Sequence, residues 1–81
     1  MVPKRGGDWA LAVAEQHVAE GEQRVTQQLV RLDEFRRAGQ PTREAERLLR
    51  NLQELLAQFR VHRDQLLRER DFSRARPPPA R

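Results

Sequence analysis

Cysteine and tyrosine are absent from this chain of 81 residues, and aromatic residues make up only 5% of it. Without cysteine there can be no disulfide framework, no thiolate metal site and no cysteine nucleophile. Apolar residues reach 37%, which is too few in so short a chain for a thick globular core. A chain of this size usually depends on a staple, a metal or a partner for its stability. The sequence therefore indicates one small domain at most.

Long hydrophobic runs are also missing. The longest uninterrupted apolar stretch covers only residues 9–14, whereas a membrane-spanning helix needs about 20 residues. Lys4 and Arg5 precede this stretch as in a signal peptide, but the acidic Asp8 stands between them and an apolar region that is too short. We therefore expect a cytoplasmic protein with no membrane segment.

Charged residues make up 35% of the chain, but most of it has no strong excess of either sign. Residues 8–71 contain eleven Arg and twelve acidic residues, so this body has no net basic field that would attract a polyanion. The net charge of +4 arises in two short tails, which carry Lys4, Arg5, Arg74, Arg76 and Arg81. Any contacts with nucleic-acid phosphates are expected from these five tail residues.

Two helices joined by a turn are expected in the body. The composition favours helix, because Ala, Glu, Leu, Gln and Arg are frequent. The first helix is predicted over about 9–38 and the second over about 43–71, with a turn at 39–42. Gly39 suits the left-handed residue that follows a helix, and Thr42 suits the N-cap of the next helix.

The ends of the chain are predicted to lie outside the helical domain, which we place at residues 8–72. Residues 1–7 contain proline and glycine and are expected to be a disordered tail, after which Asp8 caps the first helix. Residues 73–81 are rich in Arg and Pro and are expected to form a second disordered tail.

Both expected helices carry apolar residues at heptad spacing, which keeps one row of side chains facing a partner helix. The row of the first helix is Leu11, Ala14, Val18, Gly21, Val25, Gln28, Leu32 and Phe35. The row of the second helix is Ala45, Leu48, Leu52, Leu55, Phe59, His62 and Leu66. With so short a connection, the fold class is all-α, an antiparallel two-helix hairpin that resembles a coiled coil.

The register of this hairpin follows from folding the chain back about Gln40. Facing residues then have numbers that sum to about 80. This register places Gly21, the smallest residue of the first row, opposite Phe59, the largest of the second. Gln28 is a polar residue within an apolar row, and we interpret it as setting the register.

Three blocks of the sequence resemble a group of short uncharacterised bacterial proteins in which they recur in the same order. The blocks are HVAEGE at 17–22, TREAERLL at 42–49 and HRDQLL at 62–67. The resemblance covers about residues 9–67. It implies a bacterial, cytoplasmic helical hairpin, and it implies no activity, cofactor or partner.

One set of side chains could in principle carry chemistry. His17 and His62 approach each other in the expected register, and Glu20 lies one helical turn from His17. A zinc site needs at least three such groups, and a catalytic histidine needs a pocket and a nucleophile or an orienting carboxylate. A two-helix hairpin offers no pocket, so we interpret the histidines as structural, with a metal site as the alternative. We expect no catalytic residue, no metal and no cofactor.

The second helix has an apolar surface wider than one partner helix covers. We predict that a second hairpin packs on this excess surface to form a homodimer, a four-helix bundle. Its predicted face is Leu29, Leu49, Leu56 and Leu67. The alternative is a monomer in which the stems of long polar side chains cover the same surface.

Three further apolar residues lie off the rows near the open end of the hairpin. Trp9 and Val13 are four residues apart in the first helix, and Phe72 follows the second. They either fold over the end of the hairpin or form a small patch that binds another protein, since Trp is frequent at binding hot spots.

The sequence therefore favours a small protein–protein interaction or structural module that is not an enzyme and whose protein partner is unknown. The alternative is a nucleic-acid accessory protein that binds phosphates through the tail residues named above. Binding through phosphates weakens steeply with salt, whereas apolar docking does not, so salt dependence separates the two.

Overall fold

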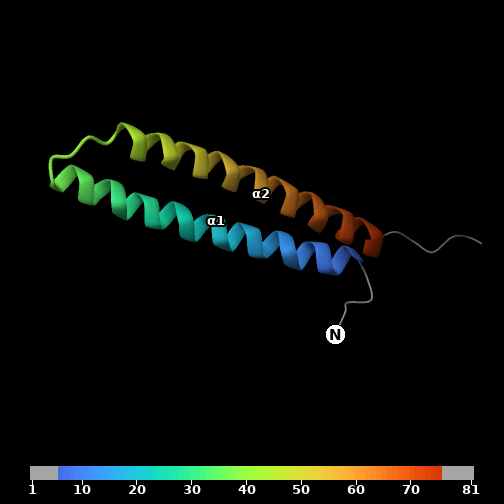
Figure 1. Ribbon diagram of the computed structural model, residues 1–81. Coiled ribbons are helices and arrows are strands. Elements are labelled where there is room, and N and C mark those ends of the chain that lie inside the picture. Colours follow the sequence, from blue (N-terminus) through green and yellow to red (C-terminus); the bar gives the residue numbers. More distant parts are fainter. Residues whose placement is uncertain (1–5, 76–81) are drawn as a thin grey trace, which may run out of the picture.

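The structure is a computed structural model that describes the backbone of residues 6–75 and the side chains from residue 9 onward. Over these residues it contains two helices, α1 (Gly6–Arg37) and α2 (Arg43–Ala75), and no strand. The helices run side by side in opposite directions and are joined by a short turn at one end (Figure 1). The predicted all-α fold with two helices packed as a hairpin is confirmed.

The turn follows the chemistry of its residues. The backbone at Gly39 has a φ of 69°, the left-handed conformation that a residue without Cβ adopts most easily. The N–H groups of Gly39 and Gln40 donate to the carbonyl oxygens of Arg36 and Phe35, at 3.1 and 2.9 Å. These two bonds form the Schellman motif, which satisfies carbonyls at the end of α1. The predicted role of Gly39 is therefore confirmed.

Replacing Gly39 tests this role. Gly39→Ala is expected to lower the free energy of unfolding by about 1–2 kcal/mol, because an L-residue in the left-handed region brings Cβ close to the following carbonyl. No atom lies within 4 Å of where that Cβ would be, so backbone strain is the whole effect. Gly39→Asn is the matched control, since Asn tolerates this conformation better. Urea unfolding followed by circular dichroism measures both, and equal losses for Ala and Asn would contradict this account.

Thr42 and Glu46 begin α2. The carbonyl oxygen of Thr42 accepts the first helical hydrogen bond from the N–H of Glu46, at 2.8 Å. The Thr42 hydroxyl donates to Oε2 of Glu46 at 2.9 Å, and the same oxygen lies 3.6 Å from Nη2 of Arg36. Thr42 thus precedes α2 as expected, while its hydroxyl binds a carboxylate and links the start of α2 to the end of α1.

The outer ends of both helices extend beyond the predicted limits. Helix α1 begins at Gly6, so Asp8 lies within its first turn and is not the residue before it; an acidic residue is favourable there because of the helix dipole. Helix α2 continues to Ala75, into the segment predicted as a tail.

The row on α1 that contacts α2 is the predicted one. All eight of its members are buried or half-buried: Leu11, Ala14, Val18, Gly21, Val25, Gln28, Leu32 and Phe35. Gln28 is 6% exposed, and its Nε2 donates to the carbonyl oxygen of Ala45 at 3.0 Å. This bond joins the two helices near the turn, as expected of a residue that sets the register.

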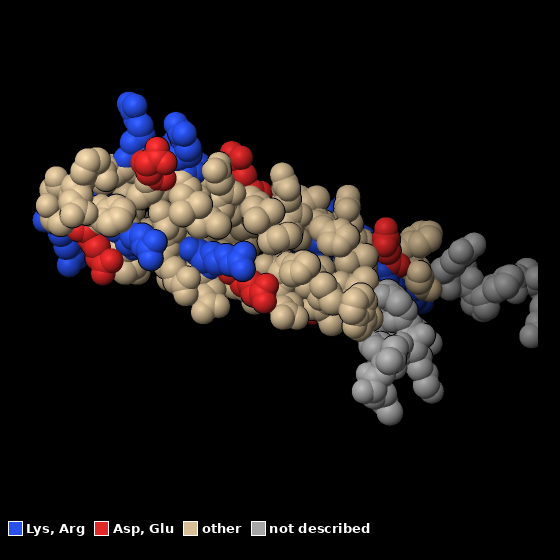
Figure 2. All heavy atoms as spheres, viewed as in Figure 1, with Lys and Arg blue, Asp and Glu red and all other residues tan. Residues whose placement is uncertain are grey.

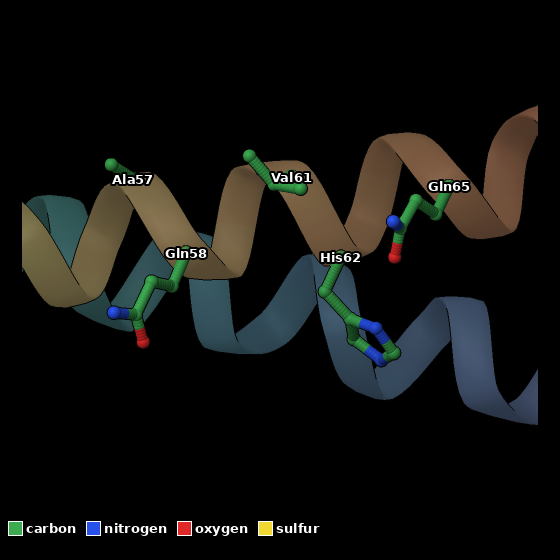
Figure 3. Close-up of a pocket in the computed structure, with 5 residues that line it drawn as sticks. All are labelled: Ala57, Gln58, Val61, His62 and Gln65. Atoms are coloured by element: carbon green, nitrogen blue, oxygen red, sulfur yellow. The ribbon is translucent and has the colours of Figure 1, made fainter.

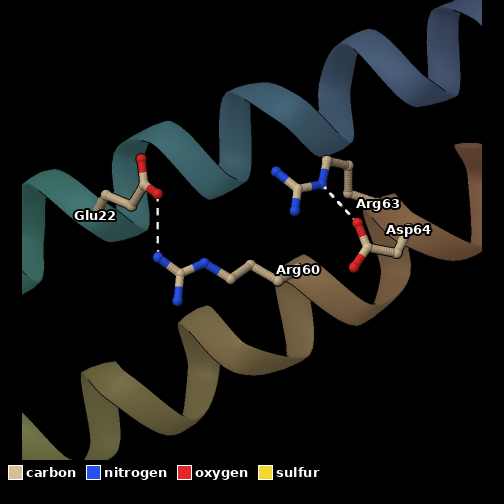
Figure 4. A network of polar contacts seen from close by, with 4 residues as sticks. All are labelled: Glu22, Arg60, Arg63 and Asp64. Carbon is tan, nitrogen blue, oxygen red and sulfur yellow. Dashed lines mark hydrogen bonds and ion pairs between the residues drawn. The ribbon is translucent and has the colours of Figure 1, made fainter.

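The row on α2 differs from the predicted one. Leu48, Leu55 and His62 are exposed, and the contact is made instead by residues that follow them by one position. The observed row is Ala45, Leu49, Leu52, Leu56, Phe59, Arg63 and Leu66. Both rows have heptad spacing and share every second member. Arg63 is the one charged residue in the observed row. Its guanidinium binds Asp64 at 3.0 Å (Figure 4), and its stem packs at the interface.

The residue nearest to Gly21 differs from the predicted one. A Cβ atom on Gly21 would lie 3.0 Å from Cδ1 of Leu56 and 3.6 Å from Cδ2 of Phe59. Gly21 therefore faces Leu56 first and touches Phe59 second. The predicted contact with Phe59 is present, and the missing side chain at Gly21 lets α2 approach α1 closely.

Candidate interaction surface

The two histidines do not form a metal site in the described part of the chain. No group of three His, Cys, Asp or Glu side chains that could hold a metal ion occurs there. The carboxylate of Glu20 accepts a hydrogen bond from Gln16 at 3.3 Å, within α1. In this structure, His17, His62 and Glu20 therefore do not come together as the zinc site that was the alternative.

His17 and His62 occupy the outer edge of the helix interface. The ring of His17 packs against that of Phe59, with centroids 5.1 Å apart and planes inclined by 34°. His62 is exposed and lines a shallow surface depression with Ala57, Gln58, Val61 and Gln65; Gln58 and His62 project from the same side of α2, and Ala57 and Val61 from the other (Figure 3). In these positions His17 covers an aromatic ring and His62 remains in solvent.

The four leucines of the predicted dimer face differ in their exposure to solvent. Leu56 is 5% exposed and packs on Gly21 inside the hairpin, so it is not accessible to a second copy. Leu49 and Leu67 are half-buried, and Leu29 is 48% exposed on α1. The reason is the changed row on α2, which turns Leu49 and Leu56 toward α1. These four leucines therefore do not form one outward face.

Two of the three residues of the predicted partner patch are exposed. Trp9 is 57% and Phe72 is 69% exposed, and Val13 is half-buried. Trp9 and Phe72 both lie near the open end, where α1 begins and α2 ends (Figure 1). Their role in binding stays a prediction.

The tail residues of the alternative function fall mostly outside the described residues. This applies to Lys4, Arg5, Arg76 and Arg81. Arg74 is described and lies exposed in the last turn of α2. Phosphate binding by the tails stays a prediction.

The outer surface of α2 contains a second row at heptad spacing that carries no charge. Its members are Leu48, Asn51, Leu55, Gln58, His62 and Gln65, and all of them are exposed. Leu48 is 45% and Leu55 is 39% exposed, so this row carries two partly exposed leucines seven residues apart. We call the part of this row formed by Leu48, Asn51 and Leu55 the leucine face.

Shallow grooves adjoin the leucine face on the side of α1. Leu48 lines one groove with Arg24, Arg31 and the half-buried Leu52. It lines a second groove with Arg31, Phe35 and Asn51. Apolar surface thus continues from Leu48 into the edge of the helix interface, so a partner that covers Leu48 would also cover part of Leu52 and Phe35.

Charge is arranged differently along the two edges of the interface. Two ion pairs join the helices, Glu22 with Arg60 at 3.1 Å (Figure 4) and Arg36 with Glu46 at 3.6 Å. They belong to one edge, because each of these residues follows a member of its contact row by one position. Acidic and basic side chains also adjoin one another on the face seen in Figure 2. The leucines at 48 and 55 follow the opposite edge, because they lie on the other side of the contact row of α2. Among the described residues, no ion pair crosses the interface at that second edge.

No family model, curated protein or solved structure matches this chain. The resemblance to short bacterial proteins and the cytoplasmic location stay predictions. Neither helix in the described range contains a segment both long and apolar enough to cross a membrane.

The leucine face was missed by reasoning from the sequence, although one signal for it was present. The row that begins with Leu48, Asn51 and Leu55 extends at heptad spacing to Gln65 and contains no Asp, Glu, Lys or Arg. The chain as a whole is 35% charged. Leu48 and Leu55 are predicted above as members of the inner row, because they fit either row. Only the absence of charge at 51, 58 and 65 distinguished a second row.

Proposed function

We propose that this chain is a non-catalytic protein–protein interaction module that binds through the leucine face. The observation that carries the proposal is the exposure of Leu48 and Leu55 on the same side of α2, with two shallow grooves of mixed polar and apolar lining beside Leu48. Adjacent exposed apolar side chains that are rimmed by polar groups are typical of surfaces that bind other proteins.

The surroundings of the leucine face support this proposal. Arg24 and Arg31 line the groove beside Leu48, so apolar and basic groups occur together. Arginine is enriched in protein interfaces, and its stem adds apolar area while its guanidinium binds carboxylates. Neither arginine has an ion-pair partner among the described residues, which leaves both available to a partner.

Capture from a cell extract with matched variants tests the proposal. The full chain is immobilised beside Leu48→Gln/Leu55→Gln and beside Leu29→Gln, which changes an equally exposed leucine on α1. Proteins that bind the natural chain and Leu29→Gln are expected to be lost from the double variant and retained at high salt, because burial of apolar surface changes little with salt. Capture that is unchanged in the double variant would overturn the proposal. Capture of nucleic acid that salt abolishes would favour the tails instead.

A further inference from the structure

We infer that the leucine face binds a second copy of this chain, with the two α2 helices antiparallel about a twofold axis at Asn51. The inference rests on the proposed function and names the partner of the same surface. Two hairpins joined in this way form an assembly of four helices.

The small core of the hairpin favours a second copy as the partner. Only six apolar side chains are buried in the described part of the chain, and no large side chain there is less than 2% exposed. Two-helix units of this size seldom bury enough surface to be stable alone, and oligomerisation is one of the usual remedies. A second copy is always present with the chain, and twofold dimers are the commonest assemblies.

The order of residues on the outer surface of α2 matches itself in reverse about Asn51. In an antiparallel pair centred there, the position that faces Leu48 is residue 54 of the other copy. Leu55 lies one residue away, about 1.5 Å along the axis. Leu48 of each copy therefore packs on Leu55 of the other, and the most exposed leucines of α2 are covered together.

The charges beside the leucine face follow the same symmetry. Arg47 and Glu54 are exposed and seven residues apart, so they lie on the same flank of the row. Neither has an ion-pair partner among the described residues. The antiparallel pair places Arg47 of each copy beside Glu54 of the other. In a parallel twofold pair this flank of the two copies would lie on opposite sides of the contact, so Arg47 and Glu54 would not meet.

Asn51 lies on the twofold axis in this arrangement. A single polar residue in an otherwise apolar row fixes the register and the number of helices, because its amide is satisfied only in one alignment. The two Asn51 side chains can donate to and accept from each other, since an amide has both kinds of group. Gln58 and His62 continue the row beyond the leucines and keep it free of charge.

Sedimentation equilibrium of the full chain tests the inference. The natural chain and Leu29→Gln are expected to dimerise equally. Leu48→Gln/Leu55→Gln is expected to raise the dissociation constant by about tenfold or more, because two leucines stay in water. A natural chain that stays monomeric at all concentrations, or a Leu29→Gln variant that loses dimer as strongly as the double variant, would overturn the inference.

Exchanging the charges of Arg47 and Glu54 tests the relative direction and the register of the two α2 helices without changing the leucines. Arg47→Glu and Glu54→Arg are each expected to weaken the dimer, because each places like charges together at two sites. The combined variant Arg47→Glu/Glu54→Arg restores opposite charges and is expected to recover the natural dissociation constant. A combined variant no tighter than the single ones would overturn the antiparallel pairing. Both changed positions are exposed, and circular dichroism of each of the three variants checks that the helices are retained.

The result also separates this inference from the proposed function. A monomeric natural chain whose captured proteins depend on Leu48 and Leu55 contradicts the second copy and retains the interaction module. A monomeric chain whose captured proteins do not depend on these leucines contradicts both.

Discussion

Leu56→Ala is expected to lower the free energy of unfolding by about 2–5 kcal/mol, the usual range for truncating a buried leucine. Leu56 is 5% exposed, and its side chain lies nearest to the position that a Cβ on Gly21 would take. Truncation leaves a space opposite Gly21, which has no side chain to fill it. The loss is measured by urea unfolding followed by circular dichroism at a fixed protein concentration.

Leu29→Ala is the matched control for this measurement. Leu29 is 48% exposed on α1, and its truncation is expected to change the free energy of unfolding by less than about 1 kcal/mol. Equal losses at positions 29 and 56 would show that Leu56 is not at the interface. The row observed on α2 would then be wrong.

Gly21→Leu is expected to destabilise the hairpin by about 1–3 kcal/mol through overpacking. The Cβ of any side chain at this position would already lie 3.0 Å from Cδ1 of Leu56, so larger groups would force the helices apart. Gly21→Ala gains about 1 kcal/mol of helix propensity, which offsets one tight contact with the flexible end of Leu56. We therefore expect Gly21→Ala to be nearly neutral, although Ala and Leu have similar propensities. Thermal unfolding of the three chains compares them.

A double-mutant cycle identifies the partner of Gly21. Gly21→Leu combined with Leu56→Ala is expected to recover part of the combined loss, because a large and a small side chain exchange sides. The same cycle with Phe59→Ala is expected to show weaker coupling, since Phe59 lies 3.6 Å from the position of the added Cβ. Stronger coupling to Phe59 would favour the register predicted from the sequence. Additive effects with both residues would contradict the hairpin interface itself.

Features that depend on neighbours in the sequence could be predicted without the structure. Gly39 ends α1 because it adopts a positive φ with little strain, and Thr42 precedes α2 because the proline at 41 cannot continue α1. The row on α1 was also predictable, since Val25 and Leu32 have no apolar neighbour and the apolar neighbours of Leu11 and Val18 are only alanines. A single strongly periodic row and one short turn are sufficient to predict a hairpin.

The limits of the helices were less predictable. Residues 73–75 were assigned to a tail because of the arginines and prolines that follow, yet they continue α2. Helix ends are decided by small differences in free energy, so local composition does not determine them to within a turn.

The alignment of α2 on α1 was decided only by tertiary structure. Leucines at 48 and 49, and again at 55 and 56, make two rows equally apolar, so periodicity alone cannot select between them. The selection depends on what α1 presents: Leu56 fits against Gly21, and Gln28 binds the backbone of Ala45. The same contacts turn Leu48 and Leu55 outward and so create the leucine face. The sequence by itself determined that this chain is a two-helix hairpin, because the signals for helices and turns are local. Which leucines lie inside, and which are left for a partner, depends on close packing between residues far apart in the chain.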